Sequence, residues 1–223
     1  MAEQNEQPLS FSDHCIRFLT ENRKPIAVVF AVICVAAAAA LTVVSINGRK
    51  AKNASIAAET LITEWMELRV KNADDMQAKE DALIEKLEAQ AAAAGGTYAS
   101  FRAYSALGEI YVLRKDWEKG LAAYEKAGQA LPKNYTAGIA YFNAAACADE
   151  LKQYEKALTF YTLSADAEDF PLKPRALFNV GRLHESLSQL DQAVAAYNKL
   201  SELYPDNSWT MLAKSRVIAL SIQ

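Results

Sequence analysis

Glycine, proline and cysteine are all scarce in this sequence. Eight glycines and six prolines among 223 residues are too few for the many turns of a strand-rich fold, so helix is the expected structure. The three cysteines, Cys15, Cys34 and Cys147, lie far apart and form no C-x-x-C pair. This spacing argues against a disulfide framework, a zinc motif or a dithiol site, and it leaves the redox compartment undecided.

The sequence also lacks an excess of charge and any motif of a known catalytic site. Its formal net charge is −3, so no basic field recruits nucleic acid. Nucleophile-elbow, phosphate-loop, dinucleotide and zincin motifs are absent. Of the two histidines, His14 is expected to be solvated in a polar tail and His184 to be packed in a helix. We therefore expect no enzyme activity, no cofactor, no metal and no small-molecule substrate.

One long apolar run is present, PIAVVFAVICVAAAAALTVVSI at residues 25–46, and it contains no charged residue. As a helix it spans about 33 Å at ~1.5 Å per residue, which matches a hydrocarbon core of roughly 30 Å. We predict an uncleaved transmembrane anchor. A cleaved signal peptide is the alternative, because Arg23 and Lys24 precede the run and its alanines offer cleavage sites. The long, acid-containing segment before the run favours the anchor.

The charges beside the run do not fix its orientation. Three basic residues flank each end, namely Arg17, Arg23 and Lys24 before it and Arg49, Lys50 and Lys52 after it. The number of basic residues is the same at both ends, so the positive-inside rule predicts neither orientation.

Beyond the run, apolar residues recur at helical spacing. The first series is Ala58, Leu61, Ile62, Trp65 and Leu68, and the second, within residues 76–94, is Leu83, Ile84, Leu87 and Ala91. Gly95 and Gly96 then supply a helix stop, because glycine readily adopts the left-handed conformation. We predict that the anchor continues into an amphipathic helix and that these two helices form a degenerate hairpin.

A repeated pattern occupies the rest of the chain. Counted from Phe101, the residues at positions 4, 7, 8, 11, 20, 24, 27 and 32 are Tyr104, Leu107, Gly108, Tyr111, Gly120, Tyr124, Ala127 and Pro132, and related residues follow Gly138 and Pro174. The pattern resembles the tetratricopeptide repeat, a helix–turn–helix unit of about 34 residues. Small residues at positions 8, 20 and 27 let helices approach closely, and large residues fill the remaining space.

These observations predict an all-α fold. It consists of a single transmembrane helix followed by an α-solenoid with a degenerate first hairpin, three clear repeat units and a C-terminal capping helix, which begins after the polar cluster Asp206-Asn207-Ser208. A generic helical bundle is the alternative. The expected segments are a polar tail (1–24), the anchor (25–46), the linker with the first hairpin (47–97) and the repeat domain with its cap (98–223).

The first helix of each unit is expected to line a concave groove with its positions 2, 5, 6, 9 and 12. The candidate partner-binding residues are Arg102, Glu109, Phe142, Asn143, Arg175, Phe178, Asn179 and Arg182, and the acids Asp149 and Glu185 occupy the same face. Phe142 and Phe178 would offer adjacent apolar platforms. Asn143 and Asn179 would hydrogen-bond an extended peptide backbone, although asparagine at this position also has a purely structural interpretation.

Repeat proteins that clamp the C-terminal carboxylate of cytosolic heat-shock chaperones resemble this chain in fold. They need basic and amide residues at positions 5 and 9 of their first unit. Ser105 and Glu109 stand there instead, and Glu109 would repel a carboxylate. A carboxylate-clamp activity is therefore not expected.

The whole chain resembles a bacterial inner-membrane family, the ancillary Sec-translocon subunits with tetratricopeptide repeats. The resemblance rests on the entry motif CIRFLTENRKP, one anchor, an alanine-rich helical pair and divergent repeats. It implies a cytoplasmic N-terminus, a periplasmic repeat domain, and Sec translocon subunits and client or chaperone proteins as partners. We therefore predict a membrane-anchored adaptor near the export translocon. The alternative is a scaffold for envelope assembly or cell-division complexes.

Overall fold

The computed structural model describes residues 11–71 and 75–222, and within these ranges the chain forms α-helices and no β-strand. The helices are α1 (Phe11–Glu21), α2 (Arg23–Lys71), α3 (Met76–Ala93), α4 (Tyr98–Leu113), α5 (Trp117–Ala130), α6 (Tyr135–Glu150), α7 (Tyr154–Asp166), α8 (Lys173–Ser186), α9 (Leu190–Leu203) and α10 (Ser208–Leu220). The predicted all-α fold is confirmed. The chain divides into two compact units, Met1–Lys50 and Ala51–Gln223.

The first unit contains α1 and the apolar part of α2. The expected polar tail holds the helix α1, with Phe11, Phe18 and Leu19 exposed on it, and its first ten residues lie outside the described ranges. Within the described residues, α2 is the one helix long and apolar enough to cross a membrane. The side chains of its apolar run contact no core and are exposed, so this run lacks a partner inside the unit.

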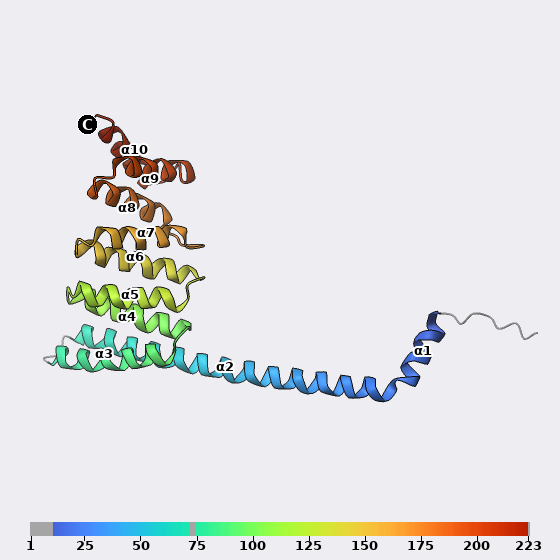
Figure 1. The fold of residues 1–223 in the computed structure, drawn as a ribbon. Coiled ribbons are helices and arrows are strands. Elements are labelled where there is room, and N and C mark those ends of the chain that lie inside the picture. The colour runs from blue at the N-terminus through green and yellow to red at the C-terminus, as the bar shows by residue number, and fades with distance from the viewer. Residues whose placement is uncertain (1–10, 72–74, 223) are drawn as a thin grey trace, which may run out of the picture. The chain divides into compact units, whose positions relative to one another are not determined.

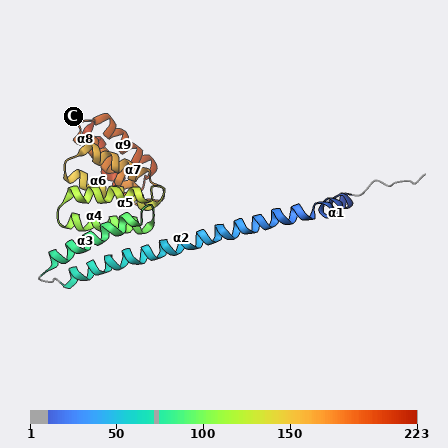
Figure 2. The same ribbon diagram turned by 60° about the horizontal axis from the view of Figure 1, so that its bottom comes forward.

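The second unit is an α-solenoid. Each helix from α3 to α10 packs against the next, and the hairpins α4–α5, α6–α7 and α8–α9 follow one another along the stack (Figure 1). Figure 2 gives the same succession from another side. Contacts also join α4 to α6 and α8 to the capping helix α10, and Arg182 on α8 pairs with Asp149 on α6. The first helices therefore form one layer of the solenoid, as the repeat predicts.

The degenerate first hairpin is formed by the end of α2 and by α3. All the apolar residues predicted to face its neighbours pack in one core with α4: Ala58, Leu61, Ile62, Trp65, Leu68, Leu83, Ile84, Leu87 and Ala91. The Trp65 indole N–H donates to Glu80 Oε1 at 2.8 Å, and Arg114 pairs with Glu80 at 2.6 Å. Gly96 has a φ of 71° after the end of α3, as the Gly95-Gly96 stop predicts.

Close approach between two helices explains the small residues of the repeat. A Cβ on Gly108 would lie 2.7 Å from the ring of Tyr124, and a Cβ on Gly181 would overlap the ring of Tyr197. In both units, therefore, the residue at position 8 leaves room for the aromatic side chain at position 24.

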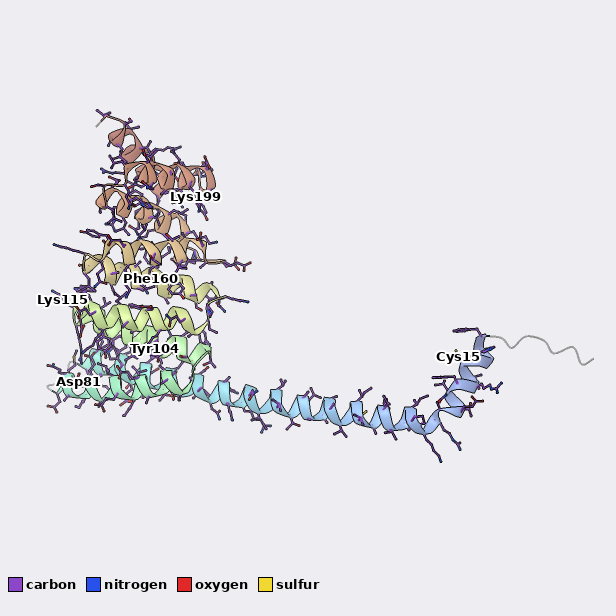
Figure 3. All side chains as sticks on the ribbon, viewed as in Figure 1. Cys15, Asp81, Tyr104, Lys115, Phe160 and Lys199 are labelled. Carbon is purple, nitrogen blue, oxygen red and sulfur yellow. The ribbon has the colours of Figure 1, made fainter. Side chains whose placement is uncertain are left out.

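The turn inside each unit ends the first helix in the same way. Lys115, Lys152 and Ser188 hold the corresponding position and have φ values of 59°, 57° and 58°. The next residue in each turn donates its N–H to a carbonyl five residues earlier, at 2.8–2.9 Å. This is the Schellman motif, usually built around glycine. Figure 3 labels Lys115 where α4 turns into α5.

The last helix, α10, packs against α8 and α9. Asn207 is its N-cap, and its side-chain oxygen accepts a hydrogen bond from the N–H of Trp209 at 3.0 Å. The predicted cap cluster is thereby confirmed. Met211 and Ile218 remain exposed on the outer side of the helix.

Candidate functional site

A groove of about 280 Å³ lies between α2, α4 and α6. Three of the predicted partner-binding residues line it, Arg102, Glu109 and Asn143, together with Ser105 and Ile139 from the same predicted face. The groove is therefore formed where successive first helices meet. The remaining predicted residues, on α6 and α8, lie outside its lining.

Several lining residues were not predicted. Ile62 and Met66 come from α2, and Tyr98 and Tyr135 are the first residues of α4 and α6. Both tyrosines are 49% exposed. A sequence signal for them exists, because each stands three residues before a unit start, at Phe101 and Gly138. The α2 wall has no such signal, since the first hairpin departs from the repeat pattern.

The guanidinium of Arg102 forms an ion pair with a carboxylate from α2. Its Nε and Nη2 donate to the two carboxylate oxygens of Glu59 at 2.5 and 2.9 Å. This hydrogen bonding lowers the pKa of Glu59, and the same contact raises the pKa of Arg102. Arg102 therefore joins α4 to α2, and its charge is neutralised within the chain.

Glu109 is exposed on the groove, and within the described ranges no residue hydrogen-bonds to or ion-pairs with its carboxylate. Thr136 also lines the groove, but its hydroxyl is buried: the residue is 2% exposed, and no described residue hydrogen-bonds to its Oγ1. The half-buried Asn143 amide likewise has no side-chain hydrogen bond to the described part of the chain. The groove thus offers the carboxylate of Glu109 and the amide of Asn143 to a partner.

Phe142 and Phe178 pack against other aromatic rings. Phe142 is 8% exposed, with ring centroids 5.2 Å from Tyr161 and 5.9 Å from Phe170. Phe178 lies 5.5 Å from Tyr197 and 5.2 Å from Trp209. Both rings are thus engaged within the chain, and their contribution to partner binding stays a prediction.

Arg175 at the start of α8 is exposed and is held by two rings. Its guanidinium lies 5.2 Å from the ring centroid of Phe142 on α6 and 5.6 Å from that of Trp209 on α10. Cation–π attraction at such distances favours one position of the side chain. No carboxylate of the described residues forms an ion pair with Arg175.

The other charged residues of this face are paired. Arg182 contacts Asp149 through Nη2, and its Nε donates to Asn179 Oδ1 at 3.4 Å. Glu185 accepts hydrogen bonds from Arg216.

Glu185 also accepts a hydrogen bond from the Tyr197 hydroxyl at 2.5 Å. Hydrogen bonding from Arg216 lowers the pKa of Glu185, and burial raises the pKa of Tyr197. These bonds connect α8 to α9 and α10.

No catalytic arrangement stands out in the part of the chain that the structure describes. Histidine, cysteine and acidic side chains form no metal-binding group of three there. His184 Nδ1 lies 2.7 Å from Gln189 Oε1. Burial raises the pKa of the Cys147 thiol to about 12, which leaves it protonated and unreactive at neutral pH.

Known proteins resemble the chain in its repeats. A tetratricopeptide repeat model matches residues 174–207, the range of the third predicted unit. A TPR repeat-containing protein of Treponema pallidum (strain Nichols) is 43% identical over 166 residues, which is 73% of this chain and 69% of that relative. Among solved structures, the Arabidopsis OM64 TPR domain is 24% identical and aligns with a TM-score of 0.44, over 53% of this chain and 94% of that domain.

Proposed function

Because the chain belongs to the family of tetratricopeptide-repeat proteins, we propose that it is a membrane-anchored adaptor which binds client proteins or chaperones near the protein-export translocon. Such repeats are protein-interaction modules. The observation that carries the proposal is the groove between α2, α4 and α6, where Glu109 and Asn143 have hydrogen-bonding capacity that the described residues do not use.

The groove has the chemistry to hold an extended peptide. A peptide backbone presents alternating donors and acceptors, and the amide of Asn143 supplies one of each kind. Tyr98, Tyr135 and Met66 at the rim give apolar contact area for side chains of a partner.

The apolar run at residues 25–46 supports a membrane tether, because its length matches the hydrocarbon core. A tether confines the repeat domain to the membrane and raises the effective concentration of weak contacts. The resemblance of the sequence to translocon subunits supports the export translocon as the neighbour. It also supports a cytoplasmic N-terminus and a repeat domain on the other side of a bacterial inner membrane.

Copurification from detergent tests the proposal. The full chain should retain translocon subunits, and a variant lacking residues 25–46 should retain them less well. The variants Asn143→Ala and Tyr98→Ala should lose client proteins while keeping helicity, because both side chains face the groove rather than the core. Absence of translocon subunits from every sample would refute this partner. Crosslinking to division or envelope-assembly proteins instead would favour the scaffold alternative.

A further inference from the structure

The charged residues on the inner face of the solenoid are mostly neutralised by one another. At positions 2, 5, 6, 9 and 12 of the three first helices stand six of them: Arg102, Glu109, Asp149, Arg175, Arg182 and Glu185. Four have a partner within the chain, in the pairs Glu59–Arg102, Asp149–Arg182 and Glu185–Arg216. Glu109 and Arg175 form no ion pair with any residue of the described ranges.

Glu109 stands at position 9 of its unit, where the third unit has Arg182, so the ion pairs of the later units are not repeated around it. An acid at position 12 of one first helix pairs with an arginine on the next first helix, as Asp149 does with Arg182 and Glu185 with Arg216. Between α4 and α6 the corresponding positions hold Val112 and Ala146. The helix α6 contains no Lys or Arg, and Arg102, which attracts Glu109 electrostatically from the same helix, is itself paired with Glu59.

Arg175 is left over for a different reason. The rings of Phe142 and Trp209 hold its guanidinium, and neither ring satisfies its N–H donors. A guanidinium that is fixed in place but still hydrated loses little entropy when a carboxylate binds it, and it can bind both oxygens at once.

We propose that the inner face recognises an extended protein segment that carries one basic and one acidic side chain, the basic side chain binding Glu109 and the acidic side chain binding Arg175. This inference rests on the proposed function and adds the partner's charge pattern and its direction along the solenoid. Charge complementarity carries it, because the paired residues contribute little net charge to this face.

The unpaired charges of the inner face, one negative and one positive, differ from those of a groove that binds a carboxylate terminus. A segment ending in acidic residues alone would meet repulsion from Glu109 and would gain only the Arg175 contact. A mixed segment gains both contacts. A segment that binds in the same direction with its two charges exchanged loses both. Glu109 and Arg175 therefore determine the direction in which the bound segment runs along the solenoid.

The test uses the full chain, purified in detergent, on an array of random-sequence synthetic peptides. The readout is the enrichment of Lys or Arg and of Asp or Glu among the bound peptides. For the wild type we expect both classes to be enriched, about two- to fivefold for an exposed charge pair. Glu109→Gln should abolish the basic enrichment alone, and Arg175→Gln the acidic enrichment alone. Glu109→Lys should replace basic preference by acidic preference.

Control variants separate charge recognition from folding. Two variants remove exposed charges from second helices: Glu118→Gln on α5 and Lys199→Gln on α9. Neither should change either enrichment. Figure 3 labels Lys199. Arg175→Lys keeps the positive charge and should keep the acidic enrichment. Circular dichroism should give the same helicity for all variants.

Four results would overturn the inference. Bound peptides without a charge preference, or a basic preference that persists in Glu109→Gln, would refute the charge pattern and leave peptide binding intact. A wild type that binds no peptide would refute the proposed function as well. Dimerisation of the wild type that both glutamine variants abolish, measured by analytical ultracentrifugation, would identify a second copy as the occupant.

Discussion

At the scale of single residues, position 8 of the repeat determines how closely the two helices of a hairpin approach. Gly108 and Gly181 lie against the rings of Tyr124 and Tyr197, whereas the second unit has Ala145 at the same position, buried in the core. Tyr197 is fully buried and its hydroxyl is bonded to Glu185. This ring therefore has little freedom to move aside for a larger neighbour.

Replacement of Gly181 by alanine should destabilise the protein. Overpacking against Tyr197 costs about 1–3 kcal/mol, and the better helix propensity of alanine returns at most about 1 kcal/mol, so we expect a net loss of up to ~2 kcal/mol. Urea unfolding followed by circular dichroism measures the free energy of unfolding. Gly95→Ala is the matched control, because a Cβ there meets its nearest atom at 3.6 Å. Equal effects of the two substitutions would contradict the packing argument.

Residue patterns predicted the small contact residues but not the pairs that join distant helices. The salt bridge between Glu59 and Arg102 connects residues 43 apart in sequence, and nothing in a helical period marks such a pair. Phe142 was expected at the surface. It is buried because Phe170, in the turn between α7 and α8, packs on its ring. Insertions between repeats follow no pattern, so this cover could not be foreseen.

At the scale of helices, periodicity and capping residues predicted most of the solenoid. The hairpin of α2 and α3, the glycine stop after α3 and the Asn207 cap of α10 all follow from local rules. The helix α1 was missed, because its apolar residues were interpreted as part of a polar tail. The groove's α2 wall was missed as well, since only the packing of the first hairpin brings it beside α4.

Acid should weaken the attachment of α10 to α8. The pKa of Glu185 is held below its ordinary value of 4.5 by the hydrogen bond from Arg216. The folded state therefore binds fewer protons than the unfolded state. The stability from this pair is present above about pH 4.5 and is lost as the pH falls through the lowered pKa. We expect Arg216→Gln to cost about 0.5–1 kcal/mol near neutral pH, because the arginine side chain is 47% exposed.

The measurement is the difference in free energy of unfolding between the wild type and Arg216→Gln, near pH 7 and near ~pH 3. The difference should shrink in acid. Lys214→Gln, which removes an exposed charge of α10 that forms no ion pair with the described residues, should show little difference at either pH. An Arg216→Gln deficit that is as large in acid as at neutral pH would argue against the Glu185 pair as its cause.

At the scale of the whole molecule, the two units have different requirements for their surroundings. The unit of residues 51–223 buries its own apolar residues in contiguous cores. In the unit of residues 1–50 the apolar run of α2 stays exposed, at a cost that grows with every apolar side chain in contact with water. A hydrocarbon environment for this run removes that cost, and the run is long enough to cross it.

The run should therefore hold the full chain in the membrane. We expect the wild type to stay in the membrane pellet after an alkaline wash and a variant lacking residues 25–46 to be released. Val35→Arg, with a charge at the centre of the run, should weaken insertion by about 2.5–3.5 kcal/mol, while the control Val35→Leu keeps it. Intact mass spectrometry of the membrane fraction distinguishes the two interpretations of the run. A retained anchor leaves residues 1–24 on the protein, whereas an N-terminus within the alanines at residues 36–40 would identify a cleaved signal peptide.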